Sequence, residues 1–241
     1  MEAMSVPALL PSKASERARV LFVLAVVLTA VIPHVPYGIY VAWPLILLST
    51  LAHELGHGFT ALAVGGRFES FRMWPDGSGV AAWGGVDDRL RIAIVAAGGL
   101  VGPAFTAMAF FVLGKRGRGA RACLLFGGVL LLAVELLLVR NPFGLVFVGA
   151  VALASLVIAV KAPEWLAQGA LVFVATELAL SVFTRADYLF TATAHTAGGT
   201  MPSDVEQMAQ ALFLPFFVWG ALCGLVSLLA LAVGVRIYLR Q

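Results

Sequence analysis

Long apolar runs dominate this chain and limit its fold more than any other feature. A helix needs about 20 residues to cross the hydrocarbon core of a bilayer. Runs of this scale occupy residues 20–39, 41–64, 92–113, 122–139, 143–160, 171–194 and 211–238. Hydrophobic residues make up 61% of the chain and charged residues 12%, which is unlike soluble globular domains. We therefore predict an all-α polytopic membrane protein, a bundle of about seven transmembrane helices.

One polar insertion, residues 65–90, interrupts the apolar pattern. Polar and apolar residues alternate from Arg67 to Trp74, the turn sequence PDGSG follows, and VAAW comes next. Alternation on both sides of such a turn is typical of a β-hairpin, predicted here over residues 68–83. Its exposed edge could pair with an extended substrate. The alternative is an amphipathic hairpin that rests at the membrane interface through Trp74 and Trp83.

The sequence as a whole indicates one membrane-embedded domain, residues 1–241, with an N-terminal tail at 1–19. Basic residues in the tail place it in the cytoplasm by the positive-inside rule. The basic loop KRGRGAR, residues 115–121, opposes that orientation if seven helices cross, because it would then lie on the other side. We expect a multi-pass protein of the bacterial plasma membrane, surrounded by the lipid bilayer and without a nucleic-acid partner. The sequence leaves the oligomeric state open.

The hexapeptide HELGHG, residues 53–58, places ionisable groups inside an apolar run. Positions i and i+4 share a helix face, so His53 and His57 would present imidazole nitrogens to one point, with Glu54 beside it. This spacing is typical of a zinc site in which a Glu takes a proton from metal-bound water. The alternative is a buried, hydrogen-bonded group, but ionisable residues at bilayer depth are costly and usually functional. We predict that His53 and His57 bind one Zn²⁺ and that Glu54 is the general base.

The motif has a wider context. The segment HELGHGFTALAVGGRFESFRMWPDGSGVAAWGG resembles the intramembrane zinc metalloproteases of the site-2 protease group, most closely the compact M50B-like subfamily of the M50 family. AAGGLVGPA (96–104), RNPFG (140–144) and a late Asp followed by a Ser-Asp pair are similar to further family motifs. The resemblance implies an endopeptidase that hydrolyses a peptide bond in or near a transmembrane segment of a membrane-embedded protein substrate. It also implies that Asn141 contacts substrate or the transition state, whereas its position before Pro142 is equally typical of a turn residue.

A catalytic zinc takes three protein ligands and keeps one position open. The resemblance implies an Asp from a later helix as the third. Asp187 lies seven residues before the end of the predicted span 171–194, as His57 lies seven residues before Val64. The two would reach similar depth if their helices run in the same direction, so we predict Asp187.

Asp204 is the alternative third ligand. The sequence around it also has a structural interpretation, because Ser203 and Glu206 have the spacing of a helix capping box and Asp204 would favour the positive end of the helix dipole.

A rival function is a transporter or a non-proteolytic scaffold that retains the fold. Paired interrupted helices with polar residues in both halves are typical of transporters, whereas polarity here is concentrated around one motif. The intact Glu54 between two histidines argues against an inactive scaffold.

Overall fold

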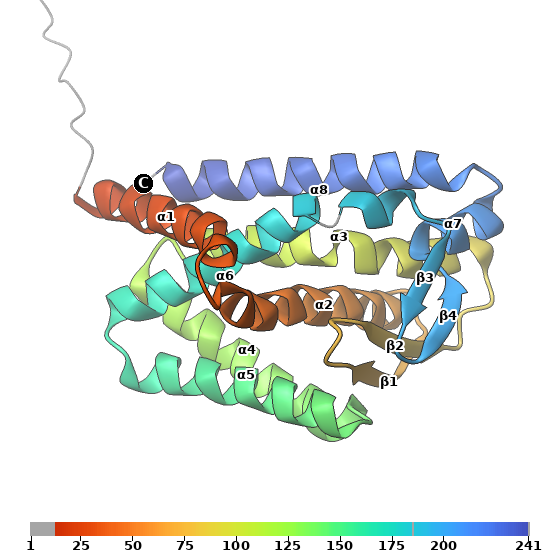
Figure 1. Cartoon of the computed structure of the whole chain (residues 1–241), viewed down its shortest axis with the longest axis horizontal. Coiled ribbons are helices and arrows are strands. Elements are labelled where there is room, and N and C mark those ends of the chain that lie inside the picture. Colours follow the sequence, from red (N-terminus) through yellow and green to blue (C-terminus); the bar gives the residue numbers. More distant parts are fainter. Residues whose placement is uncertain (1–12, 185, 241) are drawn as a thin grey trace, which may run out of the picture.

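Helices account for most of the chain, and two small antiparallel hairpins join them (Figure 1). The computed structural model describes residues 13–184 and 186–240, apart from the side chains of residues 13–15, 17, 33, 186 and 187. The elements are α1 (Lys13–Val31), η1 (Ile32–His34), α2 (Gly38–Ala63), β1 (Arg67–Met73), β2 (Gly79–Gly84), α3 (Arg89–Leu113), α4 (Gly117–Leu138), α5 (Pro142–Lys161), α6 (Glu164–Thr184), η2 (Ala186–Phe190), β3 (Thr193–Thr196), β4 (Gly199–Pro202), α7 (Asp204–Leu212) and α8 (Phe216–Leu239).

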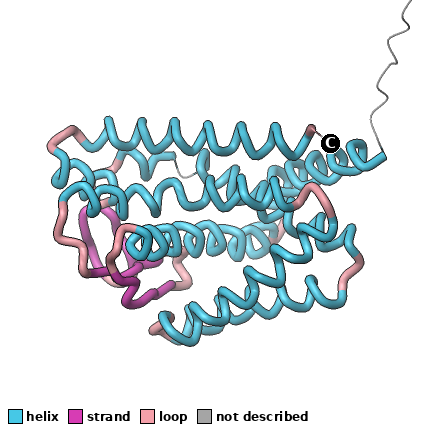
Figure 2. The backbone as a smooth tube through the Cα atoms, turned by 180° about the vertical axis from the view of Figure 1, so that it is seen from behind, coloured by secondary structure: helices cyan, strands magenta, loops and turns pink. Residues whose placement is uncertain are grey.

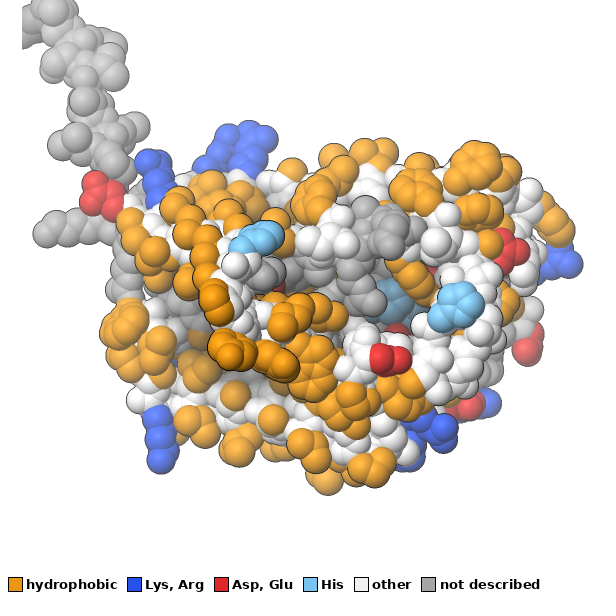
Figure 3. All heavy atoms as spheres, viewed as in Figure 1, with side chains coloured by type: hydrophobic (Ala, Val, Ile, Leu, Met, Phe, Trp, Pro, Cys, Tyr) orange, Lys and Arg blue, Asp and Glu red, His pale blue; other side chains and the backbone are white. Residues whose placement is uncertain are grey.

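The predicted polytopic α-helical fold is confirmed, with six described helices long and apolar enough to cross a membrane rather than about seven. They are α2, α3, α4, α5, α6 continued through η2, and α8. Large apolar side chains such as Phe126, Leu136 and Val146 face outward, and apolar atoms cover much of the surface in Figure 3. These exposed faces suit contact with lipid.

The first predicted span is shorter than expected. The apolar part of α1 covers only Ala18–Val31, because Pro33 follows and the chain passes into the short helix η1. Proline disfavours helical geometry in the residue before it. The run predicted at 20–39 is therefore broken, and α2 begins separately at Gly38.

The predicted hairpin is confirmed as β1 and β2, which pair from Arg67 with Gly84 to Met73 with Gly79. A second hairpin, β3 with β4, was not predicted. It begins at Thr193, so its first two residues fall within the predicted span 171–194 and the rest lies beyond it. Its signal was the Gly-Gly pair at 198–199, where Gly199 has φ +127°, a conformation that glycine adopts readily.

Helix α2 lies at the centre of the bundle. It packs on α3 through small residues, and a Cβ at Gly56 would overlap the carbonyl of Gly98. Small residues of this kind allow helix backbones to approach closely in membranes. On its other side, Leu47 and Leu51 pack with Phe71 of β1 in a core that also includes residues of α4 and α5. Both hairpins lie at the same end of the bundle (Figures 1 and 2).

Candidate metal centre

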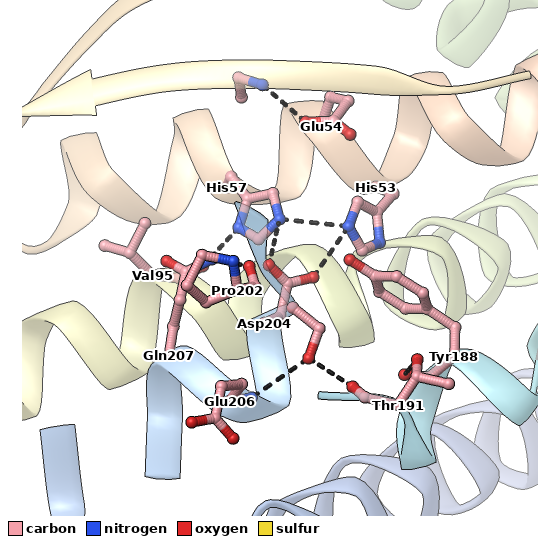
Figure 4. Close-up of polar contacts among 12 residues, drawn as sticks. His53, Glu54, His57, Val95, Tyr188, Thr191, Pro202, Asp204, Glu206 and Gln207 are labelled. Atoms are coloured by element: carbon pink, nitrogen blue, oxygen red, sulfur yellow. Dashed lines mark hydrogen bonds and ion pairs between the residues drawn. The ribbon is translucent and has the colours of Figure 1, made fainter. Parts of the chain in front are cut away.

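Three potential metal ligands meet where α2 and α7 approach each other (Figure 4). Nε2 of His53 lies 3.0 Å from Oδ2 of Asp204, and Nε2 of His57 lies 3.3 Å from Oδ1 of the same carboxylate. The two Nε2 atoms are 3.2 Å apart. The i, i+4 spacing on α2 therefore brings both imidazoles to one point, as predicted, and α7 supplies a carboxylate there.

The tautomer of His57 leaves a ligand atom available. Its Nδ1 lies 2.9 Å from the backbone oxygen of Val95 on α3. A carbonyl oxygen only accepts hydrogen bonds, so Nδ1 carries a proton, and in the neutral ring, which is the form that binds a metal, Nε2 holds a free lone pair. Hydrogen bonding of the far nitrogen to a carbonyl is the usual way in which proteins orient a metal-binding histidine.

The residues present fit a divalent metal ion. Asp204 is buried, and its Oδ2 accepts no hydrogen bond even though His53 Nε2 is at ion-pair distance. A buried carboxylate oxygen without a hydrogen bond is costly, and a cation between this oxygen and the two imidazoles would remove that cost. Two imidazoles with one carboxylate are a common donor set for zinc and related metals.

Asp204 belongs to the first turn of α7, outside the six candidate spans. Burial opposes its ionisation, but the electrostatic interaction with His57 and the contacts from both imidazoles outweigh that effect and hold the pKa of Asp204 well below its usual range. The group is therefore a carboxylate at neutral pH, which is the form that binds a metal.

The turn before α7 aims Asp204 at the histidines. Ser203 caps the helix by accepting a hydrogen bond from the Glu206 backbone N–H, and its own hydroxyl donates to the carbonyl of Thr191 (2.5 Å). The capping role expected of Ser203 is present, while the Glu206 side chain accepts a hydrogen bond from Gln210. Asp204 thus combines a helix N-terminal position with a place in the candidate centre.

The structure brings the alternative acid, Asp204, to the histidine pair. Asp187 lies in η2, and its side chain is outside the described residues. Its assignment as third ligand stays a prediction. A similar depth for Asp187 and His57 requires a helix that runs to residue 194, but α6 ends at Thr184.

Glu54 lies beside the three ligand candidates without joining them. Its side chain is buried, and Oε2 accepts a hydrogen bond from the backbone N–H of Ala81 on β2 (2.7 Å). A Cβ at Gly79 would come 2.8 Å from Cγ of Glu54, so the absence of a side chain there lets β2 approach α2. The hairpin therefore holds the carboxylate next to the centre.

A cavity of about 120 Å³ adjoins the site. His53 and Glu54 line it together with hydroxyl groups from several helices, including Ser49 and Ser181. A space of this size with such polar groups in its wall has room for several water molecules. Tyr188, which sequence analysis had not singled out, also lines the cavity, and its ring meets that of His53 edge-on at 5.8 Å.

Two glycines of the segment AAGGLVGPA explain how α3 reaches the centre. A Cβ at Gly99 would overlap Nε2 of His57, and a Cβ at Gly98 would overlap Thr60. Any larger residue at Gly99 would therefore occupy the space of the ligand atom.

Asn141 lies away from the ligands, at the outer edge of β1. Its amide donates to the carbonyl of Met73 (2.5 Å), and its Oδ1 accepts from the backbone N–H of the same residue (3.2 Å). Next to it, the backbone N–H of Arg140 donates to the carbonyl of Phe71. These contacts give Asn141 a structural role, closing one edge of the hairpin, and it is not among the residues that line the cavity.

The comparisons with known proteins agree with this geometry. No curated protein and no solved structure matches the chain significantly. A family model described as Peptidase M50B-like matches residues 21–234 and so covers most of the sequence, including every residue of the candidate centre. On this match, the chain belongs to the Peptidase M50B-like family of membrane metalloproteases.

Proposed function

We propose that the protein is a zinc-dependent intramembrane endopeptidase, which hydrolyses a peptide bond in or near a transmembrane segment of a membrane protein. The observation that carries this proposal is the convergence of His53, His57 and Asp204 beside a carboxylate, Glu54, that is not one of the three. Membership of a peptidase family supports the same conclusion.

The proposed zinc ligands are His53, His57 and Asp204. When bound, zinc would supply Lewis acidity, which polarises a carbonyl and makes water nucleophilic near neutral pH. The hydrogen bond from His57 Nδ1 to Val95 fixes the ring so that Nε2 faces the centre. The buried Asp204 supplies the negative charge that the two neutral imidazoles lack.

Glu54 is the proposed general base. The N–H of Ala81 holds one carboxylate oxygen, and the other can accept a proton from the water that attacks the scissile carbonyl. The same proton then passes to the amine that leaves when the C–N bond breaks. The carboxylate is buried and lines the cavity, so it can act on water molecules held there, away from the surrounding lipid.

The hairpin suggests how a substrate would be held. The edge of β1 is covered by Arg140 and Asn141, whereas β2 lies on the Glu54 side and its residues are partly accessible. An extended peptide that added to β2 through main-chain hydrogen bonds would lie beside the proposed base. We therefore favour substrate guidance over a purely interfacial role for the hairpin.

The test compares the parent protein with His57→Ala in cell membranes and after purification. The parent should contain stoichiometric zinc and should generate new protein termini within transmembrane segments, detected by mass spectrometry, and both should be lost in the variant. Zinc without any metal-dependent cleavage would favour the non-proteolytic scaffold. Absence of zinc in the folded parent would favour a metal-free transporter.

A further inference from the structure

The cavity beside the candidate centre extends past His53 and Glu54 into the helical part of the bundle. Residues of both hairpin regions form its outer wall, among them Ser78 and His195. Ser49 also lines the cavity. Because α2 runs towards β1, Ser49 lies one helical turn, about 6 Å, farther from the hairpins than His53. The cavity therefore has an inner end that lies beyond the candidate ligands.

Serine side chains from three helices line this inner end. Ser49 belongs to α2, Ser181 to α6 and Ser227 to α8. Leu100 and Pro103, both well inside α3, add an apolar wall. These five residues are called here the inner pocket, which combines hydroxyl groups with aliphatic surface.

Two hydroxyl groups of the inner pocket are buried and have no hydrogen-bond partner in the part of the chain that the structure describes. Ser49 is 4% exposed and Ser227 is 2% exposed. A serine inside a helix commonly donates to a backbone carbonyl about one turn earlier, as Ser155 does to Val151 (2.8 Å). A buried hydroxyl group without a partner costs free energy. Ser49 and Ser227 therefore require partners that enter the cavity.

The size of the cavity limits what can enter it. Its volume is about 120 Å³, which is less than the roughly 150 Å³ of a cavity that holds one benzene molecule. The backbone of a bound peptide must also find room near His53 and Glu54. An aromatic side chain is therefore too large for the inner pocket, whereas a side chain of few atoms fits.

We propose that the inner pocket binds a small, hydrogen-bonding side chain of the substrate, that of Ser, Thr or Asn, next to the bond that is cleaved. This inference rests on the proposed endopeptidase function. In a transmembrane helix such a side chain can bond to its own backbone, and it loses that partner when the segment is extended for cleavage. Ser49 and Ser227 replace the lost partner, so the substrate and the pocket satisfy each other's hydrogen bonds.

A library of single-span membrane proteins with randomised transmembrane segments tests the preference. The library is co-expressed with the parent enzyme, and mass spectrometry identifies the new termini. Ser, Thr or Asn should be enriched over Ala and Phe by at least about fivefold at one fixed position beside the cut, because an apolar residue there leaves a buried hydroxyl group unsatisfied. Cleavage without this enrichment would overturn the inference alone. Absence of any cleavage would overturn the proposed function, and the inference with it.

A matched pair of substrates tests whether the two serines cause the preference. One cleaved segment is prepared with Ser or Ala at that position, and kcat/KM is measured in detergent for the parent and for Ser49→Ala combined with Ser227→Ala. The parent should favour the Ser segment by at least about fivefold, and the ratio should fall to about one in the double variant. Zinc content should not change. Each single variant should lower the ratio in part, which provides a second measurement if the double variant folds poorly.

Ser155→Ala is the matched control. Ser155 bonds to its own helix and is not among the described residues that line the cavity, so this variant should keep the ratio of the parent. A double variant that keeps the ratio would overturn the inference. If that variant also cleaves both segments more slowly by the same factor, the two hydroxyl groups hold water rather than a substrate side chain.

Discussion

Oδ1 of Asp204 lies 3.3 Å from Nε2 of His57, which joins the first turn of the short helix α7 to the central helix α2. The contact depends on the whole segment between them, because α6, η2 and the β3–β4 hairpin must return the chain to α2 before α7 begins. A metal ion bound by both residues should therefore hold α7 against α2.

The first prediction concerns the third ligand. Asp204→Ala removes the only carboxylate among the three described ligand candidates. Removing a residue that merely hydrogen-bonds to a metal ligand lowers metal affinity by roughly 10- to 100-fold, so loss of Asp204 itself should lower zinc affinity by more than that. Zinc content after dialysis against a metal buffer measures the effect.

Two controls make this result specific. Glu206→Ala on the same helix should leave zinc binding intact, since Glu206 contacts Gln210 rather than the histidines. Asp187→Ala should also retain zinc. Loss of zinc in Asp187→Ala together with retention in Asp204→Ala would restore Asp187 as the ligand.

Local patterns were the predictable part of this protein. His53, Glu54 and His57 lie on one helix, so their relation follows from helical geometry alone. The hairpin around residues 68–83 follows from alternation and a strong turn. Both features depend on neighbours in sequence, and the structure shows both.

The features that sequence reasoning missed depend on where helices stop. A helix expected to reach residue 194 ends at Thr184, and the hairpin that follows places Asp204 at the histidines. Likewise, Pro33 shortens the first apolar helix and changes the number of crossings. Average hydropathy does not locate the residue at which a helix ends, because short polar turns and apolar strands leave the average over a window of about 20 residues nearly unchanged.

The second prediction concerns Gly99. Gly99→Ala should displace His57 and lower zinc affinity, because the added Cβ would overlap Nε2. The control is Gly127→Ala in α4, where a Cβ meets nothing within 4 Å. Alanine favours helix over glycine by up to about 1 kcal/mol, so the control should keep zinc and match or exceed the parent in thermal stability. Equal zinc affinity in both variants would contradict the close packing of α3 on the centre.

The third prediction separates two roles for Asn141. If it closes the edge of β1, Asn141→Ala should lower the unfolding free energy by about 1–3 kcal/mol, because it leaves the N–H and carbonyl of Met73 without partners. Zinc content should not change. Thermal unfolding in detergent measures the effect. Unchanged stability with strongly reduced cleavage would instead support contact with substrate or the transition state.

The last prediction concerns Glu54, which is proposed to take the proton from the attacking water. Glu54→Gln keeps the size of the side chain and an oxygen that can still accept the hydrogen bond from Ala81, but it removes the base. General acid–base catalysis contributes about 100- to 10,000-fold, so cleavage should fall by that order while zinc remains bound. Glu54→Asp is the matched variant: it restores a carboxylate one methylene further away, and partial recovery of cleavage is expected. Metal content and cleavage must be measured on the same purified sample. Undiminished cleavage by the glutamine variant would remove Glu54 from the mechanism, and loss of zinc would show that its carboxylate is itself a ligand.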